Sequence, residues 1–237
     1  MSRLTVEASA CTHVGLVRHR NEDAVYAGQN LFAVADGLGG HAAGDIASTT
    51  AIDILKPYDR LHAPADLSAL LGQAIYSANE ALRHRIEREP DLAGMGTTLV
   101  AMLWSGTAAV VANIGDSRAY LLRGGNLTQI SEDHTYGNLV ADAADVPNLR
   151  EKIARFLDGR ADGRSPDLIQ RTLCPGDRYL LCSDGLSGLV PNEVIENILL
   201  AHPTPKDAAD DLLATANAHG GLDNITMIVI DVLRRKE

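Results

Sequence analysis

Several features that mark other classes of protein are scarce in this sequence. Aromatic residues make up 4% of its 237 residues, so it lacks the stacking platforms that bind single-stranded nucleic acid. Its 21 lysine and arginine residues face 31 aspartate and glutamate residues, which gives a formal net charge of −10. A chain this acidic, with no basic run, repels nucleic acids and anionic membrane surfaces. We therefore expect neither nucleic acid nor a membrane among its partners.

Cysteine and long apolar runs are scarce as well. The three cysteines, Cys11, Cys174 and Cys182, are too few and odd in number for a disulfide framework, and they fit a reducing compartment. The first residues lack the apolar segment of a signal peptide, and no apolar run approaches the length that spans a bilayer. We therefore expect a cytoplasmic protein, which we also expect to be a monomer.

Hydrophobic residues, by contrast, make up 46% of the chain, which is enough for a large core. The length suits one large domain, and we expect residues 1–237 to form it. Short apolar runs bounded by Gly, Asp, Asn or Ser predict β-strands. These runs are 31–35, 97–104, 108–114, 120–122, 179–182 and 225–232. The runs between residues 96 and 130 are separated only by short breaks, which predicts an antiparallel meander.

Helical patterns lie between the groups of strands. Apolar residues recur at helical spacing over 66–88, and the alanine-rich segment 41–55 predicts a second helix. Two more are expected near the C-terminus, one after Pro191 and one with Thr204 as its N-cap. Strands in groups and helices in pairs predict an α+β fold with two antiparallel sheets and helices outside. The polar, weakly periodic segment 136–166 is expected to leave the core as a flap-like excursion.

Aspartates stand at the ends of the predicted strands. Asp36, Asp116 and Asp184 each follow a strand, and Asp223 precedes the last one. They meet at one edge of a sandwich if the last strand runs opposite to those before Asp36 and Asp184. Carboxylates so close together repel, and oxygen-binding divalent cations such as Mg²⁺ or Mn²⁺ remove that conflict. Asp-Gly is also a common turn pair, so the pattern alone leaves open whether they converge.

The segment from Arg18 to Asp23 adds a cation and two acids, Glu22 and Asp23. The planar guanidinium of Arg18 suits a phosphate group, although such a segment is also typical of a solvated polar loop.

Other chemistries lack their motifs. A cysteine-based phosphatase needs an arginine six positions after its cysteine, and Val17, Leu180 and Gly188 occupy those positions here. The sequence has no P-loop, no dinucleotide-binding fingerprint, no nucleophile elbow and no H-E-x-x-H zinc motif.

Seven short motifs in order give the sequence a family resemblance. They are Arg18-x-x-Asn21-Glu22-Asp23, Asp36-Gly37-Leu38-Gly39-Gly40-His41, Gly96-Thr97-Thr98, Gly115-Asp116-Ser117-Arg118, Asp133-His134, Ser183-Asp184-Gly185-Leu186 and Asp223-Asn224-Ile225-Thr226. With them the chain resembles the metal-dependent Ser/Thr protein phosphatases of type 2C (PPM family), in their bacterial branch, from about Gly15 to Val232. The resemblance implies an α-β-β-α sandwich.

The resemblance also implies a centre of two Mn²⁺ or Mg²⁺ ions. Asp36 would bridge both ions, and the carbonyl of Gly37, Asp184 and Asp223 would complete the protein ligands.

Further roles are implied around this centre. Glu22 and Asp23 would hold metal-bound waters, and Asp116 would take part in a third, weaker metal site. Arg18 would hold the substrate phosphate. Leu38 stands where eukaryotic members carry a histidine, as is usual in the bacterial branch, so the proton donor for the leaving group is unassigned.

The function implied is hydrolysis of phosphoserine and phosphothreonine in proteins by a water that bridges the two ions. No covalent phosphoenzyme is needed, which agrees with the missing cysteine motif. The partners would be phosphoproteins, including a Ser/Thr kinase. Two alternatives stay open: a regulatory phosphatase acting on an anti-anti-sigma-type phosphoprotein, and a non-catalytic pseudophosphatase that binds partners.

Overall fold

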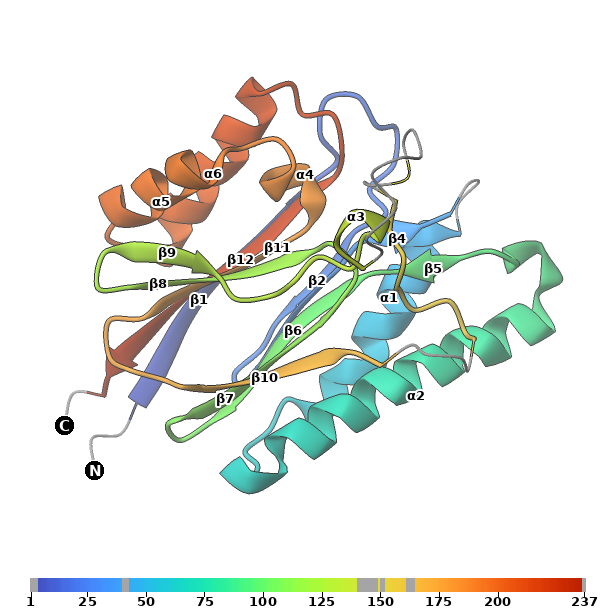
Figure 1. Ribbon diagram of the computed structural model, residues 1–237, viewed down its shortest axis with the longest axis horizontal. Helices are drawn as coiled ribbons and strands as arrows, with labels where there is room; N and C mark the ends of the chain where they lie inside the picture. Colours follow the sequence, from blue (N-terminus) through green and yellow to red (C-terminus); the bar gives the residue numbers. More distant parts are fainter. Residues whose placement is uncertain (1–3, 40–42, 140–148, 150–151, 161–164, 236–237) are drawn as a thin grey trace.

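Two five-stranded antiparallel sheets lie face to face, with helices on the outer face of each (Figure 1). The computed structural model describes residues 4–39, 43–139, 149, 152–160 and 165–235. The first sheet has the order β1 (Leu4–His13), β12 (Ile225–Arg234), β11 (Arg178–Cys182), β8 (Arg118–Arg123) and β9 (Asn126–Gln129). The second has the order β10 (Asp167–Thr172), β7 (Ala108–Ile114), β6 (Leu99–Ser105), β3 (Leu31–Ala35) and β2 (Ala24–Ala27). A short pair, β4 (Gly37–Leu38) and β5 (Gly96–Thr97), completes the strands of the described residues. The predicted α+β sandwich is confirmed.

The helices are α1 (Gly44–Leu55), α2 (Leu67–Arg88), α3 (Tyr136–Leu139), α4 (Asp184–Ser187), α5 (Asn192–Ala201) and α6 (Pro205–Ala218), with 3₁₀ turns at Lys56–Tyr58, Pro64–Asp66 and Pro90–Leu92. The four predicted helices form as α1, α2, α5 and α6, and two short helices, α3 and α4, were not predicted. The predicted cap is present, because the Thr204 hydroxyl accepts a 3.1 Å hydrogen bond from the Asp207 amide. Helices α1 and α2 cover the second sheet, and α6 covers β1 and β12 of the first.

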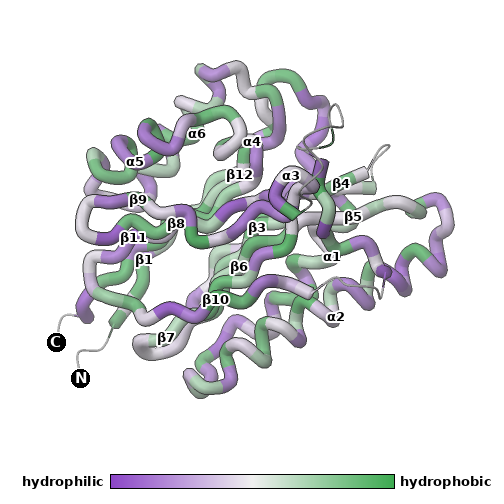
Figure 2. The backbone as a smooth tube through the Cα atoms, in the orientation of Figure 1, coloured by the Kyte–Doolittle hydropathy of each residue, from purple (hydrophilic) through white to green (hydrophobic). Residues whose placement is uncertain are grey.

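The central strands are buried on both faces, which explains their continuous apolar sequences. In β3, Phe32 and Val34 pack between the sheets against residues such as Ile228 of β12. The alternate residues, Leu31 and Ala33 among them, pack against α1 and α2. Figure 2 shows the same division, with hydrophobic strands in the interior and hydrophilic residues on the outer faces of the helices.

The prediction of one continuous meander between residues 96 and 130 is wrong. β6 pairs with β7 and β8 with β9, but the chain crosses from one sheet to the other between β7 and β8. The crossing lies at Gly115, whose φ of +117° favours glycine. A β-carbon there would lie 2.5 Å from the Cβ of Thr98, so only glycine fits beside that threonine. Apolar alternation does not specify which sheet a strand joins, so this crossing could not be predicted from the sequence.

Strand β1 was not predicted, although it pairs with β12 along its whole length, from Leu4 opposite Arg234 to His13 opposite Ile225. Its residues are only half-buried or exposed, because it is the edge strand of its sheet. The short edge strands β2 and β10 were missed in the same way.

The strand directions bring the four aspartates to one end of the sandwich. Cys182 of β11 lies opposite Met227 of β12, so the end of β11 meets the start of β12. Val34 of β3 and Asn113 of β7 both lie opposite Val100, so β3 and β7 run in the same direction. Asp36, Asp184 and Asp223 line one cavity, so the three do converge as the sequence allowed. The start of β1 and the end of β12, where Leu4 lies opposite Arg234, are at the other end of the molecule (Figure 1).

The excursion predicted for 136–166 is only partly visible, because 140–148, 150–151 and 161–164 lie outside the described residues. Two backbone contacts connect the described part of the excursion to the rest of the structure. Ile153 bridges Thr135, and Leu157 exchanges two 2.9 Å backbone hydrogen bonds with Thr97. Among the described helices, none is both long enough and apolar enough to cross a membrane.

Candidate active site

A cavity of about 880 Å³ opens at the end of the sandwich where the aspartates gather. Four parts of the chain that are far apart in the sequence line it, together with one residue of the excursion. The lining residues are Val17, Arg18, His19, Arg20, Glu22, Asp36, Gly37, Leu38, Gly39, Ile153, Asp184, Asp223 and Asn224. Six of the eight predicted site residues are in this set. Gly40 and His41 of the second motif lie outside the described residues.

The carboxyls in and behind this cavity are buried close together, and the positive side chains near them do not offset their negative charge. Burial raises the pKa of Asp36 well above its usual range, and the charges of Asp23 and Asp184 raise it further. Burial, then the charge of Asp223, raises the pKa of Asp184. The protein alone therefore disfavours the charged form of these groups, and a bound cation would reverse that preference.

Asp23 and Asp116, the two predicted residues outside the lining set, lie behind it. One buried oxygen of each, Oδ1, has no hydrogen-bond partner among the described atoms. The other oxygen of Asp23 accepts a 2.9 Å hydrogen bond from Ser183. Burial raises the pKa of Asp23 to about 6 and that of Asp116 to about 7, with the charge of Asp184 contributing to both. Buried oxygens without partners are unfavourable unless a ligand or water satisfies them.

The donor set fits hard divalent cations, since it consists of carboxylate and carbonyl oxygens. No three acidic, histidine or cysteine side chains of the described residues are already arranged around one point as the ligands of a single ion. Each ion would therefore take few protein oxygens and keep several waters, as Mg²⁺ does when one or two carboxylates hold it.

Two glycines, Gly37 and Gly44, allow the Glu22 segment to lie close to the Gly37 backbone and to the start of α1. A β-carbon on Gly37 would lie 2.5 Å from the carbonyl oxygen of Glu22, and one on Gly44 would lie 2.6 Å from the Oε2 of Glu22. A larger residue at either position would push the Glu22 segment away from the start of α1. The glycines therefore hold Glu22 and the Gly37 backbone at the same side of the cavity.

The backbone of Asp36 is fixed by the two threonines beside β5. The Thr98 amide and the Thr97 hydroxyl each donate a 2.9 Å hydrogen bond to the Asp36 carbonyl, and the Asp36 amide donates a 3.1 Å bond to the Thr98 hydroxyl. The Thr98 hydroxyl also lies 2.7 Å from that of Ser117, next to Asp116. This pair of threonines links two of the aspartate loops.

Arg18 lies on the rim and pairs with Asp223. Its Nη2 lies 2.7 Å from the Oδ2 of Asp223, and the Arg18 side chain is 55% exposed. The guanidinium therefore keeps donors free for a ligand in the cavity.

Asn224, beside Asp223, holds the Arg18 loop in place. Its amide nitrogen donates to the carbonyls of Val14, at 3.0 Å, and Arg20, at 2.8 Å, and its oxygen accepts a 2.8 Å bond from the Glu22 amide. The sequence showed Asn224 only as part of a motif and gave no sign of this role.

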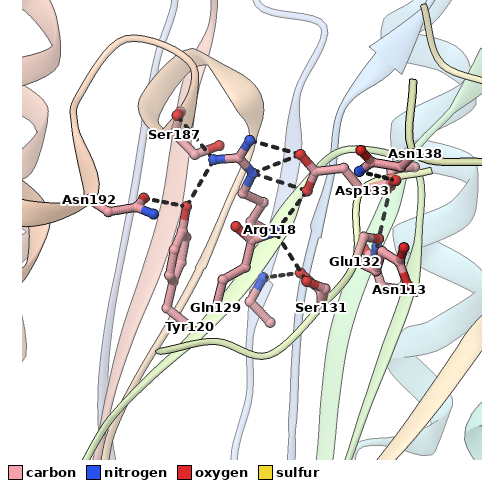
Figure 3. Close-up of polar contacts among 12 residues, drawn as sticks. Asn113, Arg118, Tyr120, Gln129, Ser131, Glu132, Asp133, Asn138, Ser187 and Asn192 are labelled. Carbon is pink, nitrogen blue, oxygen red and sulfur yellow. Dashed lines mark hydrogen bonds and ion pairs between the residues drawn. The ribbon is translucent and has the colours of Figure 1, made fainter. Parts of the chain in front are cut away.

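Arg118 is a second residue whose role the sequence did not reveal (Figure 3). Its guanidinium makes a two-pronged ion pair with Asp133, with Nη2 2.7 Å from Oδ2 and Nε 3.0 Å from Oδ1. It also donates to the Ser187 carbonyl at 3.3 Å and to the Tyr120 hydroxyl at 3.2 Å. Because Ser187 ends α4, which begins at Asp184, Arg118 connects the Asp116 loop to the helix that carries Asp184.

His134 holds the other side of the Asp116 loop. Its amide donates to the Gly115 carbonyl at 2.9 Å, and the Gly115 amide donates to its Nδ1 at 3.2 Å. Since Nδ1 accepts a hydrogen bond, the ring proton is on Nε2, which lies 3.0 Å from the Oδ2 of Asp167. The segment Asp133–His134 thus fixes the loop on both sides of Asp116.

A model of the family described as Protein phosphatase 2C matches residues 9–139. The serine/threonine phosphatase stp of Listeria monocytogenes is 35% identical over 93% of this chain and 93% of its own length. The chain belongs to the protein phosphatase 2C family. The family predicted from the seven motifs is therefore confirmed.

The serine/threonine protein phosphatase PstP of Mycobacterium tuberculosis is more similar, at 44% identity over 98% of this chain, which spans 46% of PstP. The crystal structure of PstP superposes with a TM-score of 0.90 over 98% of this chain and 100% of the solved one. The catalytic domain of PstP has also been solved in complex with two manganese ions, at 43% identity, with a TM-score of 0.88 and 97% and 99% coverage. The individual residue roles in this phosphatase 2C chain stay predictions.

Replacing Arg118 with lysine tests whether it positions the phosphatase 2C site. Arg118→Lys removes the two-pronged ion pair with Asp133, and we expect the free energy of unfolding to fall by about 1.5–3 kcal/mol. We also expect Mn²⁺ affinity, measured by calorimetry, to fall about tenfold, because residues that orient ligands have effects of this size.

The matched control is Arg123→Lys. Arg123 makes the same kind of paired contact with Asp177, at 2.7 Å through Nε and 2.7 Å through Nη2, at the other end of β8. It should lose stability but keep Mn²⁺ affinity. Equal effects of both variants on Mn²⁺ binding would show that Arg118 acts only on overall stability.

The raised pKa values of Asp23 and Asp116 predict how stability depends on pH. The folded protein keeps protons on these carboxyls that the unfolded chain releases near its ordinary pKa of 3.8. In chelator, the contribution of these two groups to stability should therefore fall as pH rises from 3.8, and the fall should be complete once pH passes about 6–7. Mn²⁺ binds the deprotonated carboxylates, so it should remove much of that fall.

Thermal unfolding midpoints across this pH range, with EDTA and with Mn²⁺, measure the effect. Asp116→Asn should flatten the curve in EDTA, whereas the exposed Asp91→Asn should leave it unchanged. A midpoint in EDTA that rises with pH over the same range would contradict the burial of protonated carboxyls.

Proposed function

We propose that this chain is a metal-dependent protein phosphatase that hydrolyses phosphoserine and phosphothreonine in proteins. One observation carries the proposal: four aspartates from four separate strand ends gather at one end of the sandwich, with the partly exposed Arg18 on the rim. Membership in the protein phosphatase 2C family supports it.

The proposed cofactor is a pair of Mn²⁺ or Mg²⁺ ions. Asp36, whose pKa responds to the charges of several neighbouring aspartates, is the residue proposed to contact both ions. The Gly37 carbonyl, Asp184 and Asp223 are the other proposed ligands. When bound, the ions would activate a water for attack on phosphorus and neutralise charge on the phosphoryl group.

Residues around this set have proposed supporting roles. Glu22, on the cavity wall, and Asp23, behind it, would hold waters of the metal shell by accepting their hydrogen bonds. Asp116, with its unpartnered buried oxygen, would take part in a third metal site. These roles use oxygens that the protein leaves unsatisfied or exposed to the cavity.

Arg18 would orient the substrate phosphate. A guanidinium offers several donors in one plane, which match two phosphate oxygens at once. Its ion pair with Asp223 fixes the guanidinium group. That contact uses only one of the guanidinium nitrogens, so the others remain available to the phosphate. The phosphate would therefore bind with its ester bond held beside the carboxylate cluster.

Other expectations belong to the same proposal. Phosphoprotein partners would include a Ser/Thr kinase. A cytoplasmic location, a monomeric state, and one domain over 1–237 with a flap at about 136–166 stay predictions. A pseudophosphatase would be expected to have lost a ligand, and every proposed ligand position here carries an oxygen donor.

The deciding experiment measures hydrolysis of p-nitrophenyl phosphate and of a phosphothreonine peptide. We expect activity with Mn²⁺, none in EDTA, and restoration when Mn²⁺ is returned. Asp36→Asn should abolish activity on both substrates and Mn²⁺ binding by calorimetry, while the exposed Asp53→Asn serves as the control. Full activity in chelator, or normal Mn²⁺ binding by Asp36→Asn, would contradict the proposal.

A separate variant tests the phosphate-binding role of Arg18. Arg18→Gln should raise KM and lower kcat/KM about tenfold or more, because a hydrogen bond to a charged group contributes about 1.5–3 kcal/mol. Mn²⁺ binding should persist. Arg20→Gln, which changes a cation on the same cavity wall, should have a smaller effect. An unchanged KM with weakened Mn²⁺ binding would assign Arg18 a structural role.

A further inference from the structure

We propose that three exposed apolar side chains beside the cavity form a surface that binds an aliphatic residue next to the phosphorylated residue of a protein substrate. The three are Leu16, Val17 and Leu222, here called the apolar platform. The inference rests on the proposed function and adds a preference in sequence to it.

Exposure is the first observation. Leu16 is 65% exposed, Val17 57% and Leu222 56%, which is unusual for large aliphatic side chains at neighbouring positions. Single exposed apolar residues are ordinary, but grouped ones at the edge of a cavity mark interaction sites.

Their position relative to the site is the second observation. Leu16 and Val17 directly precede Arg18, and Leu222 directly precedes Asp223. Because Arg18 and Asp223 are 2.7 Å apart, the two segments lie side by side. Val17 also lines the cavity itself. The apolar platform therefore meets the cavity at Val17, next to the proposed phosphate site.

The two segments are joined by backbone contacts. The Leu16 amide donates a 2.7 Å hydrogen bond to the Gly221 carbonyl. A β-carbon on Gly221 would lie 2.8 Å from the Cγ of Leu16, so the Leu16 side chain lies against that glycine. The Gly221 amide in turn donates to the Ala216 carbonyl at 3.1 Å, at the end of α6. The platform therefore stands on a fixed backbone and can bind a ligand with little ordering cost.

A phosphoprotein segment is the occupant that this geometry favours. With a phosphate held at Arg18, the neighbouring residues of an extended chain are about 3.3 Å further along per residue, which brings them over the rim. Val17 and Ile153 are apolar residues that line the cavity. An aliphatic neighbour of the phosphorylated residue would bury apolar surface against Val17 and the rest of the apolar platform.

The test compares two phosphothreonine peptides of equal length and charge, one with leucine on both sides of the phosphothreonine and one with asparagine. We expect the protein with Mn²⁺ to hydrolyse the leucine peptide with about tenfold higher kcat/KM, mainly through KM, as an apolar contact of this size provides. In the double variant Leu16→Asn, Leu222→Asn, the ratio between the two peptides should approach one. Because each ratio is taken within one protein, a change in the chemical step common to both peptides cancels.

The matched control is Leu200→Asn, which removes a leucine that is also exposed but lies on α5. It should keep the wild-type ratio. A wild-type ratio near one, or an unchanged ratio in the double variant, would overturn the proposal.

Two further outcomes are distinguishable. If p-nitrophenyl phosphate and both peptides resist hydrolysis in the presence of Mn²⁺, the proposed function itself fails, and the platform falls with it. If sedimentation shows a dimer that the double variant dissociates, the platform binds a second copy of the chain and the proposal is overturned.

Discussion

The structure depends on one constraint, which is that several carboxyls are buried together at one end of a β-sandwich. Burial and mutual repulsion both raise their pKa values, so the protein by itself holds protons there that it would release in water. Among the described residues, Arg18 is paired with Asp223 at the rim and Arg118 with Asp133, and burial still raises the pKa values of the carboxyls. Divalent cations would neutralise more of this charge, so they would stabilise the folded protein.

The loops that carry these carboxyls are held by groups other than the carboxyls. Thr98 fixes the Asp36 backbone, His134 fixes the backbone at Gly115, and Asn224 fixes the segment from Val14 to Glu22. The backbones of these loops are thus fixed by other groups, while the carboxyls of Asp36 and Asp184 also share a hydrogen bond, which adds to burial in raising the pKa of Asp36. Arg118 adds a connection between two of these loops. Ligands fixed in this way lose little freedom when an ion binds, which favours affinity and a defined geometry.

The sequence predicted the parts of the fold that local chemistry decides. Apolar runs such as that of β3 and the cap at Thr204 depend on neighbouring residues, so they could be identified without coordinates. The crossing at Gly115 could not, because the choice of sheet depends on a contact with the distant Thr98. The convergence of the aspartates required strand directions, which the sequence did not determine. The pairing of Arg118 with Asp133 likewise depends on the path of the chain, so its connection to α4 was invisible in the motif.

The residues proposed for the reaction differ from the residues proposed for recognition of the substrate protein. In the proposed function, the carboxylate cluster and Arg18 would act on groups that every phosphate ester shares, so they would give little basis for distinguishing one phosphoprotein from another. Selection among substrates must then come from residues that contact the chain on either side of the phosphorylated residue. In the described structure the residues proposed for this contact lie on the segments before Arg18 and before Asp223, and Ile153 of the excursion also lines the cavity. Because the rim segments are attached directly to the residues proposed to bind phosphate and metal, a side chain that binds there also fixes the phosphate ester relative to the carboxylates. Recognition of neighbouring residues can therefore improve the alignment of the reacting bond as well as affinity.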